Sequence, residues 1–151
     1  MIQRIQSIYL FLAAACLGST FLLPLATASG DATVLASTGD NFFADGVFWA
    51  KEHPGAFASY MVAAVAIWAI FLFKNRQRQM QLAMLSTILT GLLMVLMLVL
   101  GYYYAQRLPE GTAVQISTGS VSFITAIPLL LLAYRAIKKD EELVRSSDRL
   151  R

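Results

Sequence analysis

Residues 74–79, with the sequence KNRQRQ, decide the fold because this short basic stretch separates two long apolar ones. Residues 57–73 precede it and residues 80–106 follow it. Each is long enough to cross a bilayer as a helix, since roughly 17–25 apolar residues suffice. So short a connection between two such segments predicts an antiparallel helical hairpin.

Two further apolar segments, residues 5–28 and 122–137, have the same character. The 151 residues are 58% hydrophobic and only 14% charged, with a mean hydropathy of +0.63, which is too apolar for a soluble domain. We therefore predict an all-α membrane protein, a four-helix transmembrane bundle that forms one domain over residues 1–151. The remaining segments are two outer loops, an inner loop and an inner tail: residues 29–56, 107–121, 74–79 and 138–151.

The basic residues are distributed unequally between the two sides of this predicted bundle. Only Lys51 and Arg107 fall in the outer loops, whereas the other ten of the 12 lie at the N-terminus, in the inner loop or in the tail. Short segments rich in Lys and Arg stay cytoplasmic, so both termini are predicted to face the cytoplasm. The residues expected to anchor this orientation are Arg4, Lys74, Arg76, Arg78, Arg135, Lys138 and Lys139. The basic pI of about 9.2 therefore indicates membrane orientation and no nucleic-acid partner.

The first apolar segment allows two other interpretations. Ala26-Thr27-Ala28 resembles a signal-peptide cleavage site, and residues 12–16 (LAAAC) resemble a lipoprotein cleavage box. Signal-peptide apolar regions usually run about 7–15 residues, which is shorter than residues 5–28. The length therefore favours a retained span.

The first outer loop contains an aromatic-rich segment with a turn signal at Asp45-Gly46, a pair that suits a tight hairpin. Residues 33–36 and 113–117 also have the alternating, β-branched pattern of short strands. One interpretation is a small antiparallel sheet that caps the bundle on the outside; the other is a turn or helix lying in the membrane interface. The residues of this predicted cap or interface are Phe42, Phe43, Asp45, Gly46, Phe48 and Trp49.

The inner tail is predicted to continue the fourth helix, since Glu141 and Arg145 are four positions apart in the favourable order. It is either a solvated helix end or a docking strip for a cytoplasmic partner or anionic headgroups. The residues of the predicted docking strip are Glu141, Leu143, Arg145, Asp148, Arg149, Leu150 and Arg151.

Small residues four positions apart predict where helices approach closely, since lipid gives no hydrophobic drive between helices. The pairs are Ala14 with Gly18, Ala15 with Ser19, and Thr87 with Gly91. They fit packing within one chain or a dimerisation face.

Residues able to support catalysis or metal binding are scarce. The single histidine, His53, lies in an outer loop, and the single cysteine, Cys16, excludes a disulfide within the chain. The predicted spans carry no Asp, Glu, Lys or His, although coupled transporters usually place such a residue there. We therefore predict no catalytic residues, no metal and no cofactor, and expect that the protein is not an enzyme.

The two ends of the chain carry a family resemblance. The opening MIQRIQSIYL (residues 1–10) and the closing KDEELVRSSDRLR (residues 139–151) resemble the terminal signatures of a family of small bacterial four-span membrane proteins, domain of unknown function 4293. The resemblance covers the whole chain in length and layout. It implies a multi-pass protein of the bacterial cytoplasmic (inner) membrane, with no catalytic motif to transfer.

Two functions fit these observations. The first is an accessory or structural subunit of a membrane assembly, whose partners are membrane lipids and either a larger inner-membrane complex or further copies of the chain. The alternative is a protein that binds a lipid, quinone or small hydrophobe. Its cavity would lie near a helix kink at Pro128 and be gated by Tyr102, Tyr103 and Tyr104.

Overall fold

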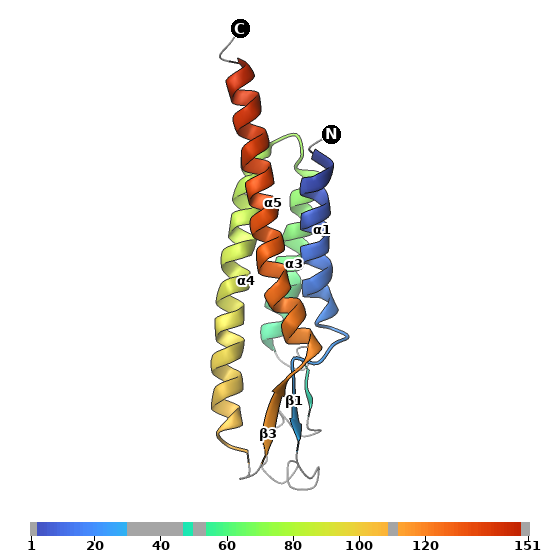
Figure 1. Ribbon diagram of the computed structural model, residues 1–151, viewed down its shortest axis with the longest axis vertical. Helices are drawn as coiled ribbons and strands as arrows, with labels where there is room; N and C mark the ends of the chain where they lie inside the picture. The colour runs from blue at the N-terminus through green and yellow to red at the C-terminus, as the bar shows by residue number, and fades with distance from the viewer. Residues whose placement is uncertain (1–2, 30–46, 50–53, 109–111, 149–151) are drawn as a thin grey trace.

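The computed structural model describes residues 3–29, 47–49, 54–108 and 112–148. Four long helices share one long axis, and a small sheet lies at one end of the molecule (Figure 1). The helices are α1 (Gln3–Ser19), α3 (Pro54–Phe71), α4 (Arg76–Ala105) and α5 (Thr118–Asp148). We call the end that carries the strands the sheet end. The opposite end, where α1 starts and α5 finishes, is the termini end.

Two of the helices are long and apolar enough to cross a membrane, over Arg76–Ala105 and Thr118–Ser146. The helices α1 and α3 contribute shorter apolar segments, Ile5–Ser19 and Phe57–Phe71. The helix α5 continues through Pro128 without a break.

The turn between α3 and α4 is short and capped by its own residues. The side chain of Asn75 accepts a hydrogen bond from the backbone N–H of Arg78 at 3.2 Å, so one unpaired donor of the first turn of α4 is satisfied. The predicted hairpin therefore forms, with α3 and α4 antiparallel (Figure 1).

The bundle core is built largely from alanine. Each of the pairs α1 with α5, α1 with α3, α4 with α5, and α3 with α4 is in contact. Alanine at the contacts lets helix backbones approach closely. The buried alanines are Ala13, Ala14, Ala63, Ala66, Ala69, Ala83, Ala126 and Ala133. Larger side chains, including Leu10, Leu17, Leu130 and Ile137, fill the space between them.

The pairs of small residues predicted to lie at close helix contacts are found there only in part. Ala14 is buried in the core, but a methyl group at Gly18 or Gly91 would meet nothing within 4 Å. Neither glycine is therefore needed for a close approach of helices within the chain.

The three strands form one antiparallel sheet of order β2-β1-β3. They are β1 (Ala26–Ser29), β2 (Val47–Phe48) and β3 (Ala113–Ile116). Ala26 is paired with Phe48 on one side and with Ile116 on the other. Strands at β2 and β3 agree with the predicted outer sheet, while the predicted strand over residues 33–36 lies outside the described residues.

The central strand β1 corrects the predicted extent of the first span, which ran to residue 28. The helix α1 ends at Ser19, where the hydroxyls of Ser19 and Thr20 donate to the carbonyls of Cys16 and Leu17, each at 2.7 Å. Pro24 then lacks a backbone donor and disfavours helix in the residue before it. The apolar residues beyond the proline are therefore free to pair as a strand.

Candidate functional site: an apolar cavity and a polar junction

The sheet end contains a cavity of about 410 Å³ between α4, α5 and the sheet. Its lining is almost entirely apolar, with no charged side chain among the residues that form it. From α4 it is lined by Met94, Met97, Leu98, Gly101, Tyr102 and Ala105, and from α5 by Ser120, Phe123 and Ile124. The sheet and the residue before it contribute Leu25, Ala26, Phe48, Val114 and Ile116.

A set of short contacts fixes the sheet to the start of α5. The backbone N–H of Gly119 donates to the carbonyl of Pro24 at 2.9 Å, and the N–H of Ser117 donates to the carbonyl of Leu25 at 3.1 Å. The hydroxyl of Ser120 donates to the same Leu25 carbonyl at 2.6 Å. A Cβ atom at Gly119 would lie 2.5 Å from the Pro24 oxygen, so only glycine permits this approach. These contacts hold the sheet side of the cavity in place.

The cavity is partly open at its edge, where Ile116 of β3 is 74% exposed. Its lining includes Leu98 and Ile124, whose side chains are 58% and 46% exposed, together with the exposed Tyr102. The hydroxyl of Tyr102 accepts a hydrogen bond from Nε2 of Gln106 at 2.8 Å, which places a polar pair at the rim. Chemically, such a site can enclose an apolar group and offer a hydroxyl at its edge.

The neighbouring tyrosines form an aromatic and cationic edge at the sheet end of α4. The guanidinium of Arg107 lies 4.4 Å from the centroid of the Tyr103 ring and hydrogen-bonds its hydroxyl. The rings of Tyr103 and Tyr104 meet edge to face at 5.6 Å. Of the three tyrosines predicted to gate a cavity, Tyr102 lines it. The cavity lies at the sheet end of α5, and Pro128 is not among its lining residues.

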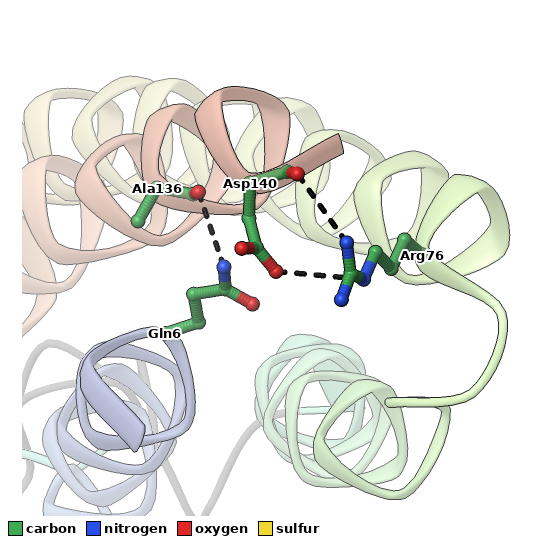
Figure 2. A network of polar contacts seen from close by, with 4 residues as sticks. All are labelled: Gln6, Arg76, Ala136 and Asp140. Carbon is green, nitrogen blue, oxygen red and sulfur yellow. Dashed lines mark hydrogen bonds and ion pairs between the residues drawn. The ribbon is translucent and has the colours of Figure 1, made fainter. Parts of the chain in front are cut away.

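A polar junction joins three helices at the termini end (Figure 2). Nε of Arg76, on α4, forms an ion pair with Oδ2 of Asp140, on α5, at 3.4 Å, and Nη1 donates to the Asp140 carbonyl at 3.3 Å. The two side chains are only 23% and 12% exposed. Nε2 of Gln6, on α1, donates to the carbonyl of Ala136 at 3.1 Å. We call this group, Gln6, Arg76, Ala136 and Asp140, the polar junction.

Sequence reasoning identified Arg76 only as an orientation anchor and missed its partner. The sequence feature that could have indicated this partner is Asp140, an acidic residue directly after two lysines at the end of an apolar segment. The cavity was also missed at its actual position, because its lining residues come from segments far apart in the sequence.

The other predicted anchors and the predicted tail lie at the termini end. Lys74, Arg78, Arg135, Lys138 and Lys139 are exposed, and Arg4 lies in α1. In the tail, Leu143 and Arg145 are exposed and Glu141 is half-buried. Among the described residues of this region, an ion pair joins Lys138 to Glu142 at 3.9 Å, whereas the sequence predicted a pair between Glu141 and Arg145. Asp148 ends α5, and Arg149, Leu150 and Arg151 lie outside the described residues.

The predicted outer cap is described only in part. Phe48 is buried in β2 and lines the cavity, and Trp49 next to it is half-buried. Phe42, Phe43, Asp45, Gly46 and His53 lie outside the described residues. Within the part of the chain that the structure describes, no three His, Cys, Asp or Glu residues come together as a metal site would require.

Comparison with known proteins gives a family and no described function. No curated protein and no solved structure matches the chain. One family profile matches residues 2–150, which is almost the whole sequence and includes all four helices and the three strands. The chain therefore belongs to the family described as a domain of unknown function, DUF4293.

Proposed function

We propose that this chain is an integral membrane protein whose four helices all lie in the bilayer. The observation that carries this proposal is the distribution of side chains on the exposed surface of α4. Its exposed residues are polar near the start, apolar in the middle and aromatic near the end. The apolar part contains Met84, Leu85, Ile88, Leu92, Val95, Leu96, Leu98 and Val99. It extends about 22 Å along the helix, close to the hydrocarbon core of a bilayer at about 30 Å once the flanking turns are added.

The exposed face of α5 supports the same placement. Val121, Ile124, Leu131 and Leu132 are exposed and apolar, whereas Arg135, Lys138 and Lys139 follow them toward the termini end. An abrupt change from apolar to basic side chains is typical of a helix that leaves the hydrocarbon core at the cytoplasmic surface. The termini end is therefore the inner side, and the sheet end is the outer side. The family resemblance supports a bacterial cytoplasmic membrane.

The packing of α1 supports a retained first helix. Leu10, Ala13 and Leu17 are fully buried. Cleavage after Ala28 would remove the whole of α1 and three of the four residues of the central strand of the sheet. We therefore favour the membrane span over the signal-peptide and lipoprotein interpretations, and expect the mature protein to have the mass of a chain that contains α1.

Cysteine labelling tests this placement in a variant that lacks the native thiol, Cys16→Ala. Single substitutions are made at exposed positions: Gln77→Cys on the inner side, Gln115→Cys on the outer side and Val95→Cys in the apolar part of α4. An impermeant maleimide added to intact spheroplasts should label only Gln115→Cys. After permeabilisation, Gln77→Cys should also be labelled. Val95→Cys should stay unlabelled until detergent is present. Rapid labelling of Val95→Cys in sealed vesicles would rule out the membrane placement. Labelling of Gln77→Cys before Gln115→Cys would show that the orientation is the reverse of the one proposed.

Within the membrane, we propose that the protein acts as a non-catalytic accessory subunit. The supporting observation is the end of α5, which projects beyond the other helices at the inner side (Figure 1). On this projection Leu143 and Val144 are 48% and 41% exposed, next to charged residues that keep it in water. A helix with exposed apolar side chains can dock in a hydrophobic groove of a protein partner.

Quantitative co-purification tests this role. Leu143→Ser combined with Val144→Ser should lower the recovery of a stoichiometric partner from native membranes by about a hundredfold or more, since burial of each aliphatic side chain contributes roughly 1.5–3 kcal/mol. Because Asp140 is left intact, the polar junction is not disturbed. The matched control is Ser146→Ala, which changes an exposed residue of the same turn without removing apolar surface. Equal recovery with all variants would exclude this surface as the docking site.

A further inference from the structure

We propose that the cavity at the sheet end holds one hydrocarbon chain of a membrane phospholipid. This site goes beyond the accessory role and does not depend on it, but it rests on the membrane placement proposed above. Three features of the cavity favour this occupant: the chemistry of its lining, the exposed apolar residues at its opening and the polar group at its rim.

The lining selects an apolar occupant. A volume of about 410 Å³ falls within the range of ligand cavities, roughly 300–1,000 Å³. Ser120 is the polar exception near the sheet, and its hydroxyl already donates to the carbonyl of Leu25. A polar ligand would lose its hydrogen bonds to water without replacement, which is costly. A hydrocarbon chain has no such bonds to lose.

Two residues at the opening face the lipid. Leu98 and Ile124 belong both to the cavity lining and to the exposed apolar faces of α4 and α5. A molecule already in the outer leaflet could therefore enter sideways without passing through water. Phospholipid chains are the most abundant molecules at that depth, so this geometry favours a phospholipid over a soluble ligand.

At the rim of the cavity, the hydroxyl of Tyr102 is placed to contact the ester end of such a hydrocarbon chain. Because Tyr102 Oη accepts from Gln106, its own proton remains available for donation. The ester oxygens of a phospholipid are acceptors placed directly above the hydrocarbon chain. Tyr102 lies near the outer end of α4, at the depth where tyrosine is enriched in membrane proteins.

Gly101 gives a direct way to fill the cavity. It lines the cavity, and a Cβ atom there would meet nothing within 4 Å, so a larger side chain would extend into space that is now empty. Gly91 is the matched control, because it lies on the same helix, has equally open surroundings and is not among the cavity residues. Both substitutions, Gly101→Leu and Gly91→Leu, raise helix propensity to the same extent.

The experiment uses the full chain in phosphatidylethanolamine vesicles that contain a phosphatidylcholine with a photoactivatable diazirine in one acyl chain. After irradiation, adducts are located by peptide mass spectrometry. We expect the segments 94–105 and 120–124 to carry more adducts per exposed residue than the exposed face of α3 around Met61 and Trp68. Gly101→Leu should lower the cavity adducts by about tenfold, as for a site that has been overfilled, while Gly91→Leu leaves them unchanged.

Several outcomes would overturn the proposal. Equal adduct density on α3 and at the cavity would identify ordinary surrounding lipid, and displacement of the adducts by added isoprenoid quinone would identify a different resident molecule. If Gly101→Leu does not fold, Leu98→Trp replaces it, because this exposed residue borders the opening and a larger side chain narrows it. An unchanged number of cavity adducts in Leu98→Trp would also contradict the proposed site. Absence of adducts on α3 would instead argue against the membrane placement, so the two proposals fail in distinguishable ways.

Discussion

At the scale of single residues, Gly119 has the most demanding surroundings of the described glycines. An added Cβ would lie 2.5 Å and 2.7 Å from the carbonyl oxygens of Pro24 and Leu23, which are backbone atoms and cannot rotate away. The start of α5 would have to move from β1. That movement would weaken three hydrogen bonds, those donated by Gly119, Ser117 and Ser120.

We expect Gly119→Ala to lower the free energy of unfolding by about 1–3 kcal/mol, the usual cost of overpacking. Thermal unfolding in detergent micelles would measure the change. Gly18→Ala is the control, because its new methyl group meets nothing within 4 Å and alanine favours helix. If the two variants unfold at the same temperature, the close approach at Gly119 does not contribute to stability.

At the scale of elements, the polar junction determines how α4 and α5 meet at the termini end. The guanidinium of Arg76 contacts both the carboxylate and the carbonyl of Asp140, so it holds the side chain and the backbone of α5 together. Loss of either partner would leave a largely desolvated charge behind. The pair formed by Lys138 and Glu142 lies on the same helix, but its side chains are 56% and 66% exposed.

We therefore expect Asp140→Asn to lower the free energy of unfolding by about 1–3 kcal/mol, and Glu142→Gln by less than about 0.5 kcal/mol. Addition of Arg76→Gln to Asp140→Asn should cost less than the sum of the two single changes, because they remove one shared interaction. Denaturant titration of the wild type, the two single variants Asp140→Asn and Arg76→Gln, and the double variant provides this cycle. Strict additivity would show that the two residues do not stabilise the fold through each other.

At the scale of the whole molecule, the sequence predicts the long elements well and their partners poorly. Runs of apolar residues interrupted by KNRQRQ were sufficient to predict four helices and a hairpin, because these features depend on neighbours in sequence. The strand Ala26–Ser29 could not be predicted from the local sequence. Its apolar residues continue those of α1, and its two partner strands lie far along the chain. The cavity and the polar junction depend on the same distant pairings, so no local pattern could locate them.

The closure of the bundle by its first and last helices has a consequence for biosynthesis. During synthesis the N-terminal part of a chain emerges first. The face of α1 that carries Leu10 and Leu17 packs in part against α5, whose residues are made last, and β1 likewise must wait for β3. The α3 and α4 hairpin can assemble as soon as both helices are made, whereas α1 has an incomplete interface until α5 follows. A nascent chain arrested before α5 would therefore expose the apolar face of α1 and be prone to associate with other chains.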